Sequence, residues 1–133
     1  MTVSENHDRS DSFGVEITRN GTSALVALVG ELDLATIEAV RRELRTLRRA
    51  NVRRLFIDLR RLTFMGSTGL RLLVELDAGS RADGYELVVI KGPPAVHRVI
   101  SLVGLEDRLP LVDRPDAAGF THTPESGRAT LGG

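Results

Sequence analysis

The sequence contains no cysteine and no tryptophan, and aromatic residues make up only 4% of its 133 positions. The lack of cysteine excludes a disulfide framework, a thiolate metal site and a cysteine nucleophile. No apolar run approaches the roughly 20 residues that a membrane-spanning helix needs. The histidines His7, His97 and His122 are dispersed along the chain. We therefore expect neither a transition-metal site nor a cofactor.

The remaining composition is that of a globular protein. Hydrophobic residues make up 41% of the chain, the formal net charge is zero, and the length suits one domain with one core. The first residues, Met-Thr-Val-Ser-Glu-Asn-His-Asp-Arg, lack the cationic start and apolar stretch of a secretory signal. We therefore expect a cytoplasmic protein with no membrane span.

Arginine dominates the basic residues, because Lys91 is the only lysine among the 18. Many arginines lie between Arg41 and Arg61, where only Glu43 and Asp58 oppose them. Such a segment could meet nucleic acid, an acidic lipid surface or an acidic protein, or it could be a solvated helix face. Because Phe56 is the only aromatic residue of this segment, it lacks the interleaved aromatics of nucleic-acid readers, and we expect no direct nucleic-acid partner.

The chain divides into three parts by composition. Residues 1–12 are polar and predict a flexible N-terminal tail. Residues 13–113 carry the apolar patterns of a folded domain. Residues 114–133 are rich in Pro, Ala, Gly, Thr and Ser, which predicts a disordered C-terminal tail and opposes a long helix there.

Apolar periodicity predicts an alternation of strands and helices within the domain. An Asn-Gly turn between the apolar runs at 15–17 and 25–29 predicts a β-hairpin. From Asp33 to about Ala50, apolar residues recur at spacings of three and four, which predicts a helix that Asp33 could cap. The following predicted elements are a strand at 54–59, a helix from Ser67, a strand at 86–90, a helix from Gly92 to Gly104, and a short strand near 109–112.

This order, β-β-α-β-α-β-α followed by a further short β, predicts an α/β fold. We expect a single domain with a small mixed β-sheet packed by helices.

Ser67 and Thr68 stand where the strand-like run changes into a helix-like run. Hydroxyls at a helix start can accept hydrogen bonds from its free N–H groups, at about 1 kcal/mol, so a plain helix cap is one interpretation. The same N–H groups and the positive end of the helix dipole also suit a phosphate on Ser67. A serine-hydrolase elbow is not predicted, because Met65 stands where Gly-x-Ser-x-Gly requires glycine. We expect no enzyme.

Two segments of the chain resemble the STAS family of anti-sigma factor antagonists. Residues 64–70, Phe-Met-Gly-Ser-Thr-Gly-Leu, resemble the family signature Asp-Ser-Ser-Gly or Asp-Ser-Thr-Gly. Residues 30–36, Gly-Glu-Leu-Asp-Leu-Ala-Thr, are similar to the Gly-Glu-(Leu/Ile)-Asp segment between the family's second strand and first helix. The resemblance covers roughly residues 13–113.

The resemblance implies a function exerted by protein contact. It implies an anti-sigma factor partner with serine kinase activity, which phosphorylates Ser67, and a metal-dependent serine phosphatase that restores the unmodified form. Unmodified protein would bind the anti-sigma factor and free a sigma factor, and phosphate would block that binding. The partner-binding residues that the resemblance implies are Asp33, Thr36, Gly66, Ser67, Thr68 and Gly69.

Gly66 departs from the family pattern, which usually has Asp immediately before the phosphoacceptor. A carboxylate there could cap the helix, orient the hydroxyl or contact the kinase, whereas glycine supplies only backbone freedom, and Thr68 could take over capping. Partner binding is therefore better supported than phosphorylation.

Other interpretations of the sequence remain open. Glu31 and Asp33 are close in the sequence and could also bind a cation. The alternative functions are a constitutive interaction module of a signalling scaffold or transporter, and a sensor of a nucleotide or lipid.

Overall fold

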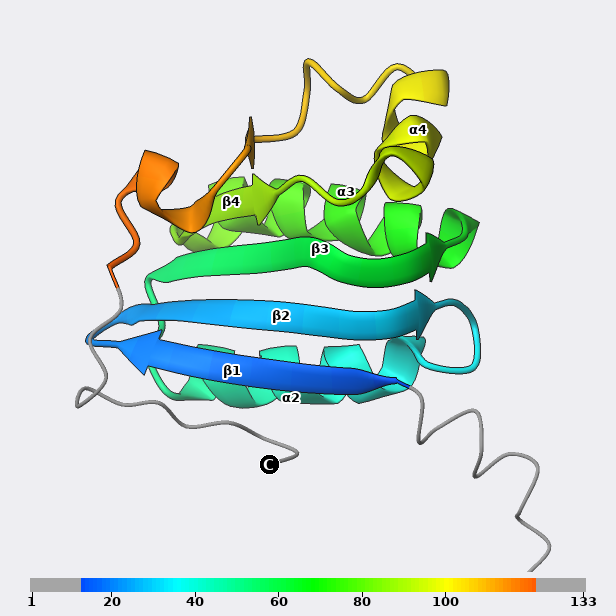
Figure 1. The fold of residues 1–133 in the computed structure, drawn as a ribbon. Coiled ribbons are helices and arrows are strands. Elements are labelled where there is room, and N and C mark those ends of the chain that lie inside the picture. The colour runs from blue at the N-terminus through cyan, green and yellow to red at the C-terminus, as the bar shows by residue number, and fades with distance from the viewer. Residues whose placement is uncertain (1–12, 122–133) are drawn as a thin grey trace, which may run out of the picture.

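The computed structural model describes residues 13–121, and it has the element order that the apolar patterns predicted (Figure 1). Both predicted tails lie wholly or mainly outside these residues. The elements are β1 (Gly14–Asn20), β2 (Ser23–Leu32), α2 (Ile37–Arg49), β3 (Arg54–Met65), α3 (Ser67–Asp83), β4 (Glu86–Ile90), α4 (Pro94–Leu102), β5 (Leu111–Val112) and the 3₁₀ helix η1 (Pro115–Ala118).

The five strands form one mixed sheet in the order β1-β2-β3-β4-β5. β1 and β2 pair antiparallel across the predicted hairpin, and every other neighbouring pair is parallel. The parallel register of β2 and β3 ends with Leu32 opposite Met65. Because both strands end at the same edge of the sheet, the loop after Leu32 and the start of α3 are neighbours in space.

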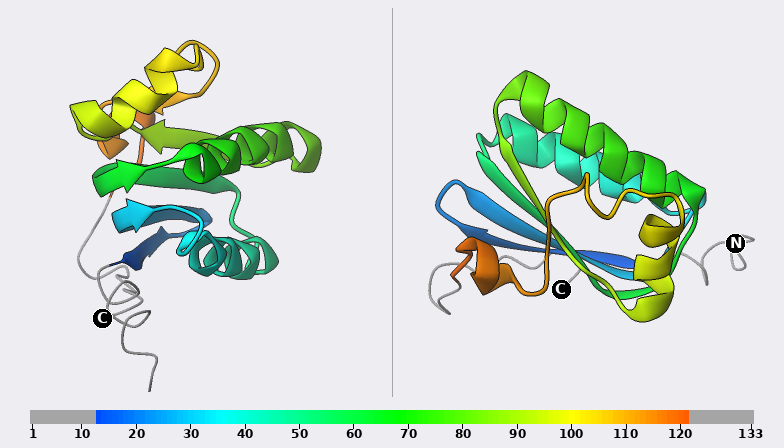
Figure 2. Two further views of the ribbon diagram at one scale, coloured as in Figure 1. Left: turned by 90° about the vertical axis from the view of Figure 1, so that its right-hand side faces the viewer. Right: turned by 90° about the horizontal axis from the view of Figure 1, so that it is seen from above.

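Helices α2 and α3 lie side by side on one face of the sheet, while α4 lies at its edge beyond β4 (Figures 1 and 2). The core lies between this face and the two helices, as the predicted α/β fold requires. It includes Leu28, Ile57, Leu73 and Val89, all of them fully buried or nearly so.

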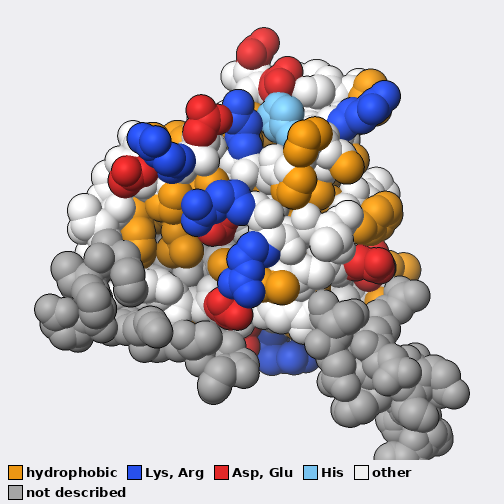
Figure 3. Space-filling model, viewed as in Figure 1, with side chains coloured by type: hydrophobic (Ala, Val, Ile, Leu, Met, Phe, Trp, Pro, Cys, Tyr) orange, Lys and Arg blue, Asp and Glu red, His pale blue; other side chains and the backbone are white. Residues whose placement is uncertain are grey.

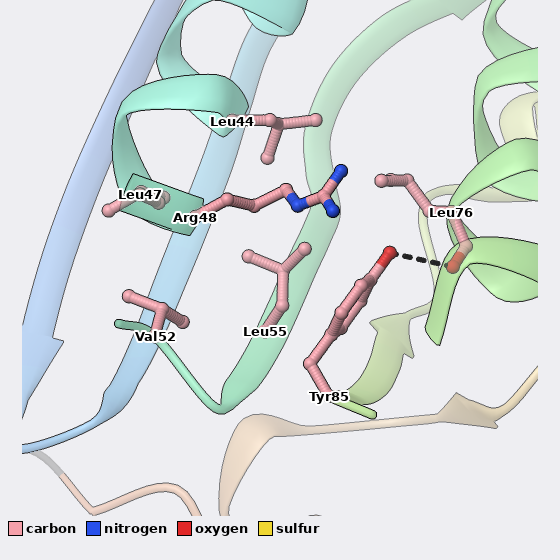
Figure 4. A pocket seen from close by; sticks show the side chains of 7 residues that line it. All are labelled: Leu44, Leu47, Arg48, Val52, Leu55, Leu76 and Tyr85. Atoms are coloured by element: carbon pink, nitrogen blue, oxygen red, sulfur yellow. Dashed lines mark hydrogen bonds between the residues drawn. The ribbon is translucent and has the colours of Figure 1, made fainter. Parts of the chain in front are cut away.

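Two ion pairs link α2 to α3, and a partly buried tyrosine binds the backbone of α3. Arg41 binds Glu75 across the helices with an N–O distance of 2.8 Å, and Arg48 binds Asp83. A small, mainly apolar pocket lies next to Arg48. At its wall the Tyr85 hydroxyl donates a hydrogen bond to the Leu76 carbonyl at 2.8 Å (Figure 4). Burial raises the pKa of Tyr85. The pocket is lined by Leu44, Leu47, Arg48, Val52, Leu55, Leu76 and Tyr85.

The arginine-rich segment does not form a single patch, because much of it is paired on different elements. Besides the two pairs on α2, arginines of β3 bind carboxylates on the opposite face of the sheet, where basic and acidic side chains lie next to one another (Figure 3). A bidentate hydrogen bond from Arg60 to the buried Asp58 raises the pKa of Arg60. The pairs on β3 are Arg54–Glu86, Arg60–Asp58 and Arg61–Glu16.

Residues 114–121, the first part of the predicted disordered tail, are ordered against the sheet. The chain after β5 forms η1 and then places Phe120, only 6% exposed, against Phe56 with ring centroids 5.1 Å apart. The Ala118 carbonyl also accepts a hydrogen bond from Arg54 at 2.6 Å. The average composition of the segment did not predict this contact, because Phe120 is a single aromatic residue among polar and small ones. Residues 1–12 and 122–133 lie outside the described range.

Two predicted boundaries were wrong. β3 continues past residue 59 to Met65, because Leu62 and Met65 stay buried and keep pairing with β2 while exposed polar residues interrupt the apolar run. The first helix begins at Ile37 and not at Asp33, because residues 34–36 form turns before it. In the described part of the chain, no helix is both long and apolar enough to cross a membrane.

Candidate functional site

Ser67 is exposed and is the first residue of α3, at the point where β3 ends (Figure 1). Gly66 is the N-cap residue, with extended backbone at φ −93° and ψ −169°. Its N–H donates to the Leu32 carbonyl at 3.2 Å, and its carbonyl accepts from the N–H groups of Gly69 and Leu70. The backbone of Gly66 therefore starts the helix, and the predicted capping by the hydroxyls of Ser67 and Thr68 was wrong.

The first turn of α3 lies directly against the end of β2. A Cβ atom added at Gly69 would come within 2.6 Å of Met65 Cγ and 2.8 Å of Leu32 Cδ2. Both side chains are buried in the core, so they cannot move away freely. The absence of a side chain at Gly69 thus lets the helix approach closely and brings Ser67 beside the β2–α2 loop.

The β2–α2 loop is held by its own polar side chains. The Thr36 hydroxyl, buried with its residue 5% exposed, donates to the Glu31 carbonyl at 2.8 Å and accepts from the Asp33 N–H at 3.0 Å. The Asp33 carboxylate accepts from the Ala35 N–H at 3.0 Å, so it closes the turn before α2 and does not cap the helix as predicted.

The predicted partner-binding residues come together in space but are not all on the surface. Asp33 is partly exposed and Ser67 is exposed, whereas Thr36 and Gly69 are buried. The roles of Thr36 and Gly69 at this surface are therefore to shape the loop and to admit close packing. Gly66 and Thr68 are partly exposed on either side of Ser67.

Exposed apolar side chains gather on the elements around Ser67. Within residues 13–121, the large apolar side chains that are exposed are Leu34 at 79%, Phe64 at 49%, Val74 at 42%, Leu102 at 75% and Val103 at 55%. They belong to the β2–α2 loop, the end of β3, α3 and the end of α4. Leu34 and Val103 follow the apolar spacing of the helices predicted at 33–50 and 92–104, which indicated buried helix faces, so the sequence did not reveal this patch. Contiguous exposed apolar surface marks an interaction site in a soluble domain.

A groove beside Ser67 continues the apolar surface. It is an open depression of about 600 Å³ between α3 and the segment that follows α4, which the view from above shows running alongside α3 (Figure 2). Ser67 is in its lining, and Arg71 lies one helical turn further along. The groove is lined by Ser67, Leu70, Arg71, Val74, Val103 and Leu105.

The site contains no arrangement that would activate Ser67 as a nucleophile. Among the described residues, none hydrogen-bonds to the Ser67 hydroxyl, and His97 instead binds Glu106 at 2.7 Å. That hydrogen bond lowers the pKa of Glu106. In residues 13–121 no three His, Asp or Glu side chains are grouped as a metal site would require. The geometry offers an exposed serine in a groove whose lining is mainly apolar.

The mixed five-stranded sheet with its three α-helices defines the described residues as a single α/β domain. The chain is a member of the STAS domain family: the family model described as "Mlab, STAS domain" matches residues 15–113.

Several proteins to which this chain is similar are anti-sigma factor antagonists. The chain is 29% identical over 100 residues to the anti-sigma F factor antagonist of Paenibacillus polymyxa, covering 74% of this chain and 86% of that protein. A crystal structure of an anti-sigma factor antagonist from Mycobacterium paratuberculosis matches with a TM-score of 0.69 and 28% identity, over 81% of this chain and 92% of that one. Unphosphorylated SpoIIAA, an anti-sigma factor antagonist, matches with a TM-score of 0.65 over 83% of this chain and 99% of that one, and at 22% identity it shows the fold alone.

Proposed function

We propose that this chain is an anti-sigma factor antagonist, a non-enzymatic regulator that binds an anti-sigma factor through the surface around Ser67 and so frees a sigma factor. The observation that carries the proposal is the concentration of exposed apolar side chains on the elements that surround this serine. Interfaces bury such side chains at their centre, with polar groups at the rim. The similarity to anti-sigma factor antagonists over most of the chain supports the same function.

Phosphorylation of Ser67 is the switch in this proposal. In the free protein a phosphate is favourable at this position, because the first N–H groups of α3 have no acceptor in the helix and Arg71 lies one turn away. In the complex the phosphate is unfavourable, since about −1.5 to −2 charges would be desolvated among apolar side chains. The modification therefore stabilises the free protein relative to the complex.

Gly66 weakens the case for efficient phosphorylation but not for binding. It leaves the loop without the carboxylate that the family usually has before the phosphoacceptor. Its backbone nevertheless starts α3 and keeps Ser67 exposed. In this proposal the anti-sigma factor is also the serine kinase, a metal-dependent phosphatase removes the phosphate, and no nucleic acid is contacted directly.

Capture of partners from native cells tests the proposal. Wild type, Ser67→Ala and Ser67→Asp serve as baits, and Thr46→Asp, at an exposed threonine on α2, is the matched control for added charge. We expect wild type, Ser67→Ala and Thr46→Asp to capture an anti-sigma factor identified by mass spectrometry, and Ser67→Asp to lose it. Intact-mass analysis should show one phosphate on the captured wild-type chain, and peptide-level phosphosite mapping should place it on Ser67.

Two results would count against parts of this function. Equal capture by all four baits with no phosphate on the chain would mean an antagonist without a switch. Failure of every bait to capture an anti-sigma factor would overturn the antagonist function itself, and would favour a scaffold or ligand-sensing role.

A further inference from the structure

The groove beside Ser67 continues along α3 as a second depression. This second part, of about 470 Å³, shares Val74 and Leu105 with the first and reaches Arg81 and Arg108. From Ser67 to Arg81 the helix rises by roughly 20 Å at 1.5 Å per residue. The combined groove is therefore as long as three to four turns of a helix laid against it.

The walls of the groove are apolar and partly exposed to solvent. Val74 and Leu70, four residues apart on α3, form one wall, and Leu105 of the segment after α4 forms the other. Val74 is 42% exposed, so apolar area remains open to solvent. Small-molecule sites enclose most of their ligand, which this open depression cannot do. An elongated partner with an apolar stripe fits it better.

The rim of the groove carries unneutralised positive charge. Among the described residues, neither Arg71 nor Arg108 has a carboxylate partner. The acid in the lining, Asp77, is already held by Arg81 at 2.8 Å. Asp107 is exposed in the same segment but does not line the groove. A partner that neutralises both free arginines would carry carboxylates beside its apolar stripe.

We propose that this groove binds an amphipathic helix of the anti-sigma factor, with its apolar face on Val74 and Leu105 and flanking carboxylates paired with Arg71 and Arg108. Helix-in-groove recognition uses apolar anchors at helical spacing, which a groove of this length accommodates. The inference rests on the proposed function for the identity of the partner, but the chemistry of the groove is independent of it.

The groove also connects the switch to the wider interface. Because Ser67 lies in its lining, a phosphate there would compete with the partner's carboxylates for Arg71 and would repel them. One modified side chain would thus weaken contacts along the groove as well as at the serine itself.

The first test uses the anti-sigma factor identified in the capture experiment. It measures the affinity of this purified partner for the wild-type chain and for its variants. Val74→Asp and the double variant Arg71→Glu, Arg108→Glu change exposed positions, and Arg45→Glu on α2 is the matched charge control. We expect each groove variant to weaken binding at least about tenfold, and the control by less than about twofold. Added salt should weaken wild-type binding more than binding of the double variant. Circular dichroism confirms that each variant is folded.

The second test needs no natural partner. Two designed 14-residue helical peptides carry the same leucine stripe, flanked in one by glutamate and in the other by lysine. With methyl-labelled protein, we expect the glutamate peptide to shift the NMR signals of Leu70, Val74 and Leu105, and the lysine peptide to leave them unchanged.

The two tests separate the inference from the function on which it rests. If Ser67→Asp abolishes anti-sigma factor binding while the groove variants bind like wild type, the function stands and the groove inference is overturned. If no anti-sigma factor is captured but the glutamate peptide binds selectively, the groove chemistry stands and the partner assignment fails. Equal shifts from both peptides, or none from either, would refute the charge argument.

Discussion

Replacing Gly69 with alanine should destabilise the domain, even though alanine is the better helix former. The new Cβ would lie 2.6 Å from Met65 Cγ and 2.8 Å from Leu32 Cδ2, closer than carbon atoms pack. Overpacking of a buried contact typically destabilises by about 1–3 kcal/mol, against a helix-propensity gain of at most about 1 kcal/mol. We expect a net loss of about 1–2 kcal/mol in the free energy of unfolding.

Urea unfolding followed by circular dichroism measures this loss. Gly14→Ala is the control, because a Cβ there would have nothing within 4 Å, and its effect should stay within about 0.5 kcal/mol. In a Met65→Ala background the Gly69→Ala change should become less destabilising, since the nearest clashing atom is gone. A Gly69→Ala protein as stable as wild type would refute the argument that close packing of α3 on β2 positions Ser67.

Three further predictions concern separate parts of the molecule. Gly66→Asp should change the free energy of unfolding by less than about 0.5 kcal/mol, because its Cβ would meet only the exposed Phe64 ring, at 3.3 Å. Phe120→Ala should lower that free energy by about 3 kcal/mol. Glu106→Gln should flatten the fall in melting temperature between about pH 5 and pH 3. The hydrogen bond from His97 lowers the Glu106 pKa, so the stability it provides is present above the unfolded pKa and disappears as pH falls through the folded one.

A contrary result for each of these three variants would contradict the reasoning behind it. A large destabilisation by Gly66→Asp would show that this loop cannot accept the residue the family usually has there. A silent Phe120→Ala would mean that the segment after β5 contributes little to the fold, and Val112→Ala on the same cluster gives a comparison. An unchanged pH profile for Glu106→Gln would show that the hydrogen bond between His97 and Glu106 is not a source of pH dependence.

The elements of the fold could be predicted because each has a self-contained apolar pattern. The strand at 86–90 was predicted to the residue, since it is a short buried run between turn signals. The end of β3 could not be predicted, because in its last six residues two exposed side chains precede each buried one, and this part of the strand is held by pairing with β2. That pairing depends on residues far away in the sequence, which local periodicity does not report.

The sequence predicted the position of the serine in the candidate site but not the exposed apolar surface around it. Ser67 could be placed at a helix start from the change of pattern around it, and the structure confirms that position. Leu34 and Val103 fit apolar helical spacing equally well, yet both are exposed. Periodicity identifies an apolar face but cannot tell whether the domain's own core or a partner covers it. The second wall of the groove, which includes Leu105, depends on how the segment after α4 runs alongside α3, and local periodicity does not report this.

The order of strands in the sheet has a consequence for how the chain folds. Each strand pairs with the one before it in the sequence, so a chain emerging from the ribosome can add strands one at a time without waiting for a distant partner. Once β3 and α3 have docked, the Ser67 loop already has its neighbours from β2. The wall supplied by the segment after α4 arrives last. We therefore expect a nascent chain to present its serine before it completes the groove.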